Sequence, residues 1–456
     1  MKKILLLLFI IFFVHSAILF PAENGWKNLN KILKNIIPPK FPDNKYLITS
    51  YGAVADGITD CTNAFRDAIN KCSNDGGGKV IVPEGTFLTG AIHLKSGVNL
   101  YISKGALVKF STDPSKYLPV VYTRFEGVEC WNYSPLIYAY EQKNIAVTGE
   151  GVLDGQGSND NWWKWKASKG EFSQTTARNK LVDMGENNVP VNERIFGEGS
   201  FLRPVFFQPY KCNNILVEGV TFKNSSMWFL NPVLCKNVTI NKVATDGIGP
   251  NNDGCDPESC SDVLIKGCSF NNGDDCIAIK SGRNNDGRRV NVPCKNIVIQ
   301  NCIMKDGHGG VVIGSEVSGN VSNVYAENCE MNSPNLDRAL RFKTNSERGG
   351  IIENVFARNI KVGEVGEAVI LIDYYYDKGD NGKFTPVMRN FNFSNITSKK
   401  SPYALNMKAY KRSPVKNLQI ENCSFENVKN RNVLENIQIT KCNSVTVNGK
   451  LIQIKK

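Results

Sequence analysis

Short apolar segments recur along most of the chain, and each of them opens with Asn or Asp followed by an apolar residue. Apolar and polar positions alternate within these segments, which is typical of β-strands that bury one face. Gly, Asn, Asp and Pro are concentrated between them. The copies start at Asn214, Asn237, Asp262, Asn296, Asn323, Asn354, Asn390 and Asn417, with an earlier copy at Asn144.

The eight later starts follow one another at intervals of 23, 25, 34, 27, 31, 36 and 27 residues. Repeats of this length that cannot bury a face alone predict a solenoid. Because they contain strands and turns, we predict an all-β fold, a right-handed parallel β-helix with one repeat per coil. Stacked coils also explain a chain of 456 residues, which exceeds the roughly 250–300 residues of one compact core. A β-propeller is the alternative, but its blades need about 40–50 residues.

The cysteines support this register. Some lie two positions before a segment start and the others six positions after one, so neighbouring coils would stack them about 4.8 Å apart. We expect them to be buried and mostly free, although export would permit some disulfides. Zinc is not expected, because no CxxC pair occurs. The nine positions are Cys212, Cys235, Cys260 and Cys294 before a start, and Cys268, Cys302, Cys329, Cys423 and Cys442 after one.

Residues 1–22 predict a signal peptide. Lys2 and Lys3 precede an unbroken apolar run over residues 4–14, and small residues follow. The run is shorter than the roughly 20 residues of a membrane span. We therefore expect a secreted protein, extracellular or periplasmic, that leaves the membrane once the signal is removed. The cleavage position stays open, and an uncleaved anchor is the alternative.

Residues 23–456 predict a single β-helix domain with two departures from the repeat. Within residues 45–95, a strand and a Gly-rich turn precede a run from Cys61 to Ser73 whose apolar residues share one helical face. A short capping helix over the first coil is predicted there, with a separate small domain as the alternative. Residues 156–203 hold three tryptophans and predict a long inserted loop, a kind of segment that is commonly functional. No helical periodicity is predicted beyond the first hundred residues.

A net charge of +12 at pH 7 favours an acidic partner. The chain has no long Lys/Arg block and no nucleic-acid-binding motif, so nucleic acid is not expected. An acidic polysaccharide fits better, and we expect the protein to act as a monomer.

Four short motifs fall in consecutive repeats. Gly273 lies eleven positions after Asp262, and Gly307 lies eleven positions after Asn296. The second and third motifs therefore occupy the same place on neighbouring coils, and we predict that all four line one face. The motifs are NNDGCD at 251–256, GDD at 273–275, GHGG at 307–310 and RFK at 341–343.

Three acids in these motifs, Asp253, Asp274 and Asp275, suit glycoside hydrolysis. One carboxyl must be protonated to release the leaving oxygen, and another must activate water or attack carbon. Crowding raises the proton affinity of at least one of them. Arg341 and Lys343 alternate on a strand and therefore share a face, where they could hold the carboxylate of a uronic acid. The two adjacent acids can share that face only at a bulge or turn, which the preceding glycine permits.

These motifs, in this order, resemble the polygalacturonase family of glycoside hydrolases, family 28. The family pattern reads N-T-D, G/Q-D-D, G-H-G and R-I-K on a right-handed β-helix, and the similarity extends from about Tyr51 to the carboxyl end. Asn252 stands where the family usually has Thr, and Asn231 where it often has His. The resemblance implies inverting hydrolysis of α-1,4-galacturonosidic linkages in pectin, with neither metal nor cofactor.

The resemblance also implies roles by position. Asp274 would be the general acid, Asp253 and Asp275 would activate the water, and His308 would tune the acid or help to hold the sugar. The residues that would bind substrate are Asn251, Arg341, Lys343 and, from the Tyr374–Tyr376 run, Tyr375.

Exo action is expected, because the chain resembles bacterial members that are often exo-acting and because the insertion could close one end of the cleft. A structural loop that packs its tryptophans on the solenoid is the alternative role for this insertion. Three other functions stay open. They are a rhamnogalacturonan galacturonohydrolase, whose relatives tend to lack the histidine at His308, a calcium-dependent pectate lyase, and a non-catalytic polysaccharide-binding β-helix.

Overall fold

The computed structural model describes residues 25–167 and 169–452. The predicted signal peptide at 1–22 lies outside these residues. Among the helices of this part of the chain, none is long and apolar enough to cross a membrane.

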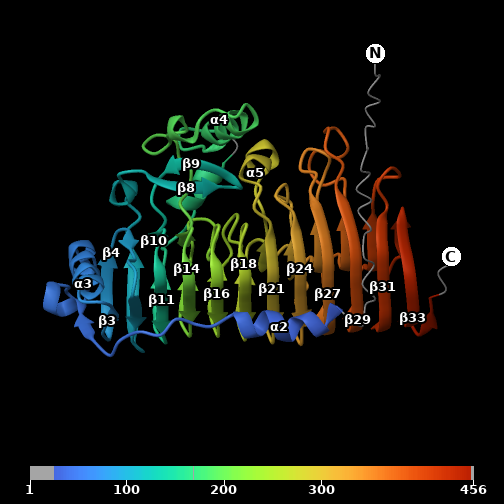
Figure 1. Cartoon of the computed structure of the whole chain (residues 1–456), viewed down its shortest axis with the longest axis horizontal. Coiled ribbons are helices and arrows are strands. Elements are labelled where there is room, and N and C mark those ends of the chain that lie inside the picture. Colours follow the sequence, from blue (N-terminus) through green and yellow to red (C-terminus); the bar gives the residue numbers. More distant parts are fainter. Residues whose placement is uncertain (1–24, 168, 453–456) are drawn as a thin grey trace, which may run out of the picture.

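The strands stack in parallel along the long axis of the molecule and form a right-handed parallel β-helix, as predicted (Figure 1). The large sheet contains β1 (Lys45–Leu47), β2 (Asp56–Asp60), β3 (Gly78–Val82), β4 (Gly85–Thr89), β6 (Val98–Ile102), β7 (Ala106–Phe110), β11 (Lys143–Gly149), β12 (Val152–Asp154), β14 (Asn213–Glu218), β15 (Thr221–Lys223), β16 (Lys236–Asn241), β17 (Ala244–Gly247), β18 (Ser261–Lys266), β19 (Ser269–Asn272), β21 (Cys294–Gln300), β22 (Ile303–Met304), β24 (Val321–Glu327), β25 (Glu330–Met331), β27 (Ile351–Glu364), β29 (Val387–Lys400), β31 (Val415–Phe425), β33 (Ile437–Val447) and β34 (Lys450–Leu451).

Three smaller sheets complete the coils and their loops. A six-stranded sheet contains β20 (Ile277–Ile279), β23 (Val311–Ile313), β26 (Arg338–Lys343), β28 (Ala368–Asp373), β30 (Tyr403–Lys408) and β32 (Val433–Glu435). A three-stranded sheet contains β5 (Ile92–His93), β10 (Ile137–Tyr140) and β13 (Phe207–Tyr210). A two-stranded hairpin contains β8 (Val121–Phe125) and β9 (Val128–Asn132).

The predicted segment starts stack as a ladder of side-chain amides. Each of these residues has a positive φ, a conformation that Asn and Asp tolerate better than most other residues do. The Asn323 amide donates to Asn296 over 3.0 Å, and Asn354 donates to Asn323 over 3.1 Å. The same bond joins Asn390 to Asn354 and Asn417 to Asn390, each at 3.0 Å. The predicted register is therefore confirmed.

Two helices near the amino terminus pack against the solenoid. The predicted cap is α3 (Thr62–Asn74), which buries Phe65, Ile69 and Cys72 at the amino-terminal end of the stack (Figure 1). The other helix, α2 (Lys27–Asn35), was not predicted. It lies across the outer face of the large sheet and buries Leu29 and Ile32 against side chains such as Tyr325 and Phe356.

The prediction of no helix beyond the first hundred residues was wrong. Helix α4 (Thr175–Glu186) lies within the insertion at 156–203, and α5 (Asn284–Val290) lies in the loop after β20. Both are short and carry few apolar residues, so neither has a strong helical period. Together with β8 and β9 they cover the same side of the solenoid (Figure 1).

Apart from one residue, the predicted cysteine stacks agree with the structure. The 14 cysteines are free thiols, and 13 of them are buried. The Cys235 amide donates to Cys260 Sγ over 3.4 Å, as expected for the same position on neighbouring coils. Cys442 is the exception. It pairs with Ile420 rather than with Cys423, because β31 and β33 pair residues that lie 22 positions apart, as Val415 and Ile437 do, whereas Cys423 and Cys442 lie 19 apart.

Candidate active site

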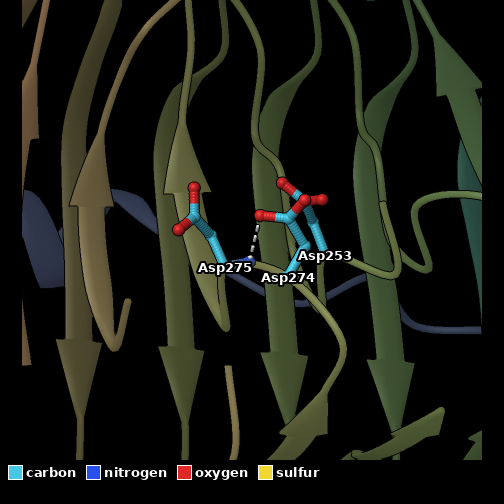
Figure 2. A group of neighbouring side chains, drawn as sticks. All are labelled: Asp253, Asp274 and Asp275. Carbon is cyan, nitrogen blue, oxygen red and sulfur yellow. Dashed lines mark hydrogen bonds between the residues drawn. The ribbon is translucent and has the colours of Figure 1, made fainter. Parts of the chain in front are cut away.

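The three predicted acids lie together, although they come from two coils. Asp253 lies one rung before Asp275, since the Gly254 amide donates to the Asp275 carbonyl over 2.9 Å. Each acid presents an oxygen atom, and these three atoms lie within 4.8 Å of one another. Asp253 and Asp275 are buried, while Asp274 is partly exposed. Asp274 is therefore the acid that a ligand reaches first (Figure 2).

A tight bend lets the two neighbouring aspartates face the same side. Residues 273–276 leave the strand geometry before β20 begins, as the paired acids required. The Asp275 amide donates to Asp274 Oδ1 over 2.9 Å, which fixes the bend (Figure 2). Gly273 is required here, because a Cβ atom would lie 2.3 Å from the carbonyl oxygen of Gly249 in the preceding coil.

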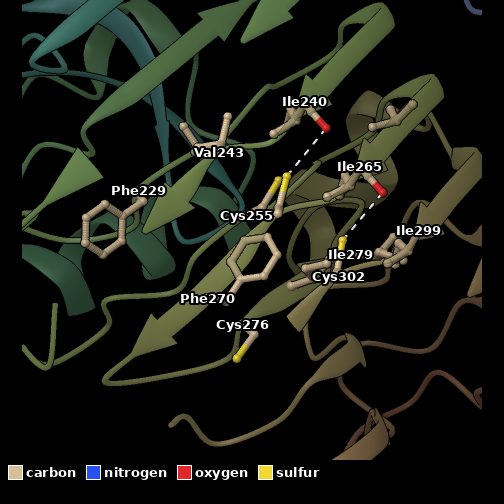
Figure 3. Close-up of a cluster of buried hydrophobic side chains, with 14 of the residues drawn as sticks. Phe229, Ile240, Val243, Cys255, Ile265, Phe270, Cys276, Ile279, Ile299 and Cys302 are labelled. Carbon is tan, nitrogen blue, oxygen red and sulfur yellow. Dashed lines mark hydrogen bonds between the residues drawn. The ribbon is translucent and has the colours of Figure 1, made fainter. Parts of the chain in front are cut away.

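The bend rests on the core of the solenoid. Cys276, which directly follows Asp275, is fully buried, as is Cys255 two residues after Asp253 (Figure 3). Phe270 and Ile279 pack in the same cluster. Apolar packing on the inner face of the bend therefore positions the carboxyl groups on its outer face. Substitutions of these core residues should displace the acids.

Arg341 and Lys343 both hold Asp275. Arg341 Nη1 lies 3.1 Å from Asp275 Oδ1, and Lys343 Nζ lies 2.7 Å from Oδ2. Both cations come from β26, on the second coil after the acid. Burial alone would raise the pKa of Asp275, but Lys343 and Arg341 outweigh it and hold this pKa well below its ordinary value. Asp275 is therefore ionised at neutral and mildly acidic pH.

His308 belongs to the next coil and contacts Asp274. Its amide donates to the Asp274 carbonyl over 3.1 Å, which confirms the predicted one-rung offset. Its ring Nδ1 lies 2.9 Å from Asp274 Oδ1. The hydrogen bond to Asp274 raises the pKa of the imidazole above its ordinary value, against the opposing effect of burial. This pair can therefore retain a proton at a higher pH than a free imidazole would.

Asp253 has a second acid, Asp256, beside it. Burial raises the pKa of Asp253 well above that of a free carboxyl, and the charges of Asp256 and Asp274 raise it further. Burial likewise raises the pKa of Asp256 to about 8. Asp253 and Asp256 therefore retain a proton between them at a pH at which Asp275 is ionised. Asp256 was not predicted, although it lies in the NNDGCD motif.

The flanking asparagines of that motif have structural partners. Asn252 closes the turn, accepting from the Gly249 amide over 3.0 Å and donating to the Met227 carbonyl over 2.8 Å. Asn251, a predicted substrate-binding residue, accepts from Arg203 Nη2 over 2.7 Å. Arg203 ends the insertion and is fully buried. The insertion is thus attached directly to the motif that carries Asp253.

A different tyrosine from the predicted one lies at the cations. Tyr375 is about half exposed, and its ring packs edge-on against Tyr410 with 5.0 Å between centroids. The ring of Tyr376 faces the site instead, 5.1 Å from Lys343 Nζ and 5.5 Å from the Arg341 guanidinium. Successive side chains of the run point in different directions, so the motif alone could not select one.

Two further charged residues, Lys280 and Glu316, lie next to the acids and were not predicted. Lys280 follows β20, and its Nζ lies 3.7 Å from Asp253 Oδ2 and 3.6 Å from Glu316 Oε2. Both residues lie outside the four motifs. The sequence offered one signal for Lys280, a lysine directly after a buried strand. No motif marked Glu316.

The spacing of the three acid oxygens would also suit a cation. Two positive side chains already neutralise Asp275, however, which weakens the attraction for a metal ion. Proton transfer is the chemistry that fits an ionised carboxyl, a carboxyl of high proton affinity and a partly exposed carboxyl side by side. A β-helix with this group of side chains on one face defines a glycoside hydrolase of the β-helical class.

The chain belongs to family 28 of the glycosyl hydrolases. The model of that family matches residues 198–447, and a model described as rhamnogalacturonase A/epimerase, pectate lyase-like, matches residues 47–103. The predicted family and the predicted enzyme class are thereby confirmed.

Relatives and solved structures agree. The chain is 44% identical to a hyperthermoactive exopolygalacturonase from Thermotoga maritima, covering 94% of this chain and 97% of that one, with a TM-score of 0.91. An exo-poly-alpha-D-galacturonosidase of Dickeya chrysanthemi is 27% identical over 77% of this chain and 61% of its own length. A family 28 exopolygalacturonase of Yersinia enterocolitica shares the fold at 22% identity, with 89% and 75% of the two chains covered and a TM-score of 0.72.

Proposed function

We propose that the protein hydrolyses α-1,4-galacturonosidic linkages of polygalacturonate and related pectin chains, and that it acts from a chain end. The observation that carries this proposal is the close grouping of three carboxyl groups on one face of the solenoid, one of which pairs with two cations. The names of the relatives from Thermotoga and Dickeya support both the substrate and the exo action.

Asp274 is the proton donor in this proposal. It is the most exposed of the three acids, and His308 lies within hydrogen-bond distance of it. Asp275 accepts the proton of the attacking water, since its two cations keep it ionised. Asp253, on the preceding rung, orients that water through its own oxygen atoms.

Arg341 and Lys343 bind the carboxylate of the sugar beside the scissile bond. They supply two positive charges to one buried carboxylate, Asp275, so one charge is left for the substrate. The Tyr376 ring beside them provides a flat surface for the same sugar. We propose Tyr376 in place of Tyr375 for this contact, and Asn251 as a further contact at the edge of the site.

Inversion has its own test, because an oxygen spacing within 4.8 Å is shorter than the roughly 6.5–9.5 Å between carboxyl groups in most inverting enzymes. Proton NMR of the first product distinguishes the two courses. Inversion of an α-linkage releases the β-anomer, whereas an initial α-anomer would indicate a covalent intermediate and retention.

The exo action follows from an asymmetric cleft. On the amino-terminal side of the acids, Arg203 fastens the insertion to Asn251 and to the Pro250 carbonyl. On the opposite side, a hollow lined by Asp373, Lys408 and other residues continues along the next coils. This difference between the two sides favours entry of a chain end from the side of the hollow. Monogalacturonate as the first product, with slow loss of viscosity, is the expected result.

The remaining alternatives are separated by one comparison of products. We expect galacturonate release from polygalacturonate, little release from rhamnogalacturonan oligomers, and none by the Asp274→Asn variant. Preference for rhamnogalacturonan would favour the galacturonohydrolase. Unsaturated, ultraviolet-absorbing products that vanish with a chelator would favour a pectate lyase. Binding without any sugar release by the wild type would favour a non-catalytic protein.

We further propose that residues 1–22 direct secretion and that the exported protein, a single β-helical catalytic domain, is a monomer. The acids and cations all come from one chain, which supports a site complete in one copy. Amino-terminal sequencing of protein from the medium or the periplasm tests the first point, and light scattering tests the second.

A further inference from the structure

Lys280 is a buried cation among the carboxyl groups of the site. Its side chain is almost wholly inaccessible, and its Nζ lies 3.7 Å from both Asp253 Oδ2 and Asp256 Oδ2 and 3.6 Å from Glu316 Oε2. The three acids come from two different coils, and Lys280 itself comes from the coil between them. One ammonium group therefore joins three successive coils.

The other surroundings of this ammonium are consistent with a fixed position. The ring of Trp228 lies 4.8 Å from Nζ, and the Gly314 carbonyl oxygen lies 3.5 Å away. Asp275 and Glu258 are the other charged groups that act on it. The cation thus has acids on several sides and an aromatic face on another.

Asp253 and Asp256 need such a cation because both are buried and lie side by side. Among the residues that the structure describes, Oδ1 of Asp253 and both oxygens of Asp256 have no hydrogen-bond donor. Two like charges in this position repel each other, and each favours the neutral form of the other. Lys280 is the one positive group within ion-pair distance of both, among the ion pairs of the described chain.

We propose that Lys280 is a positioning residue of the hydrolysis, which fixes the Asp253 carboxyl toward the attacking water and keeps negative charge available on it. This inference rests on the proposed function, in which Asp253 orients the water. The substrate meets Asp274 and the two cations of β26, whereas Lys280 acts only through Asp253 and Asp256.

The test compares Lys280→Met with Asp256→Asn through the pH dependence of kcat/KM on a galacturonate oligomer. Loss of the ammonium raises the pKa of Asp253, so the acidic limb should move to higher pH by about 1–3 units. Burial raises the pKa of Asp256 to about 8, so this acid is already neutral on the acidic limb, and the limb of Asp256→Asn should stay near that of the wild type. Lys280→Arg keeps the charge, and its limb should stay near that of the wild type.

A role in folding alone would lower kcat in the methionine variant without moving the limb, and that result would overturn the proposal. Limbs that move in the same direction in the Met and Asn variants would also overturn it. If Lys280→Met does not fold, the double variant Lys280→Met/Asp256→Asn, which also removes an acid that pairs with Lys280, takes its place. Its limb should lie at higher pH than that of Asp256→Asn if the proposal holds.

A second measurement does not depend on activity. Carboxyl-carbon NMR of protein labelled in aspartate, with the Asp253 signal assigned through Asp253→Asn, gives the titration of Asp253 directly. The proposal requires a higher midpoint for Asp253 in Lys280→Met than in the wild type. For the double variant, the midpoint must be higher than in Asp256→Asn. If the wild type released no sugar, the proposed function would fail, while this titration would still decide whether Lys280 controls Asp253.

Discussion

Nδ1 of His308 lies 2.9 Å from Oδ1 of Asp274, although 34 residues separate them in the chain. The contact exists because GHG follows GDD at the same place on the next coil. A histidine beside the acid that the substrate meets first links the protonation of the two groups, and the prediction for His308→Gln depends on that link.

Replacement of Asp274 by Asn should abolish most of the activity. The amide has no proton to donate to the leaving oxygen, and general acid catalysis typically contributes about 10²–10⁴-fold. Partial exposure of the side chain should leave the melting temperature almost unchanged. Reducing-end assays and thermal unfolding check both expectations. Asp246→Asn, an exposed acid on β17, is the matched control and should keep wild-type activity.

His308→Gln should move the basic limb of the pH profile to lower pH. Asp274 raises the pKa of His308, so the pair keeps its proton above the range of a free imidazole. Without the imidazole, the site lacks the group whose raised pKa retains that proton at higher pH. The profile of kcat/KM checks this, and an unmoved basic limb would show that His308 serves only to hold the sugar.

Lys343→Met should lower the free energy of unfolding, and more strongly at pH 7 than at pH 3. Asp275 has a depressed pKa in the folded state, so its stabilising effect is present above the unfolded pKa of about 3.9 and fades below it. Removing one partner of a buried pair costs up to about 3–5 kcal/mol. Denaturant unfolding at both pH values measures the difference.

Lys361→Met is the control for that substitution. Lys361 forms an ion pair with Glu330, and both side chains are more than half exposed. Exposed pairs typically contribute about 0–1 kcal/mol. An equal loss in both variants would contradict the importance of the buried pair.

Asp256→Asn should stabilise the protein, relative to the wild type, more at pH 8 than at pH 4. Burial raises the pKa of Asp256 to about 8, so the folded protein binds a proton that the unfolded chain releases. Stability therefore falls in the wild type as the pH rises from about 4 to 8, and the amide removes this dependence. Thermal unfolding at both pH values tests this, and equal shifts at the two would contradict it.

Arg203→Gln should weaken the exo preference. The side chain holds Asn251 and the Pro250 carbonyl, and through them it fixes the insertion beside the acids. A looser insertion should let internal parts of the polymer enter, so viscosity should fall faster for each bond broken. Lys180→Ala, an exposed change on α4, should leave the ratio unaltered.

Much of the fold could be predicted because the solenoid repeats its signal. The Asn or Asp at each start adopts a positive φ, and most of these residues bond to the start of a neighbouring coil, so one physical requirement recurs along the solenoid. Helix α2 has an amphipathic pattern, but it occurs once and outside the repeat. Cys442 does not stack on Cys423 because the last two coils pair residues 22 positions apart and not 19, an offset that the spacing of the segments does not reveal.

The site was predictable where it depends on register and unpredictable where it depends on side-chain direction. The rung offset of His308 follows from counting residues. The choice of Tyr376 over Tyr375 depends on how the chain bends after Asp373, whose carboxylate accepts from the Tyr375 amide over 2.8 Å. Lys280 lies outside every motif, and its role depends on three acids that meet only in the folded coils.

The asparagine ladder has a consequence for how such enzymes diversify. Each ladder residue sets the phase of its own coil against its neighbour, while intervals between ladder positions range from 23 to 70 residues. Extra residues can accumulate in an outer loop without altering the alignment of the next rung. Evolution can thus remodel the walls around the reaction centre while its geometry stays constant.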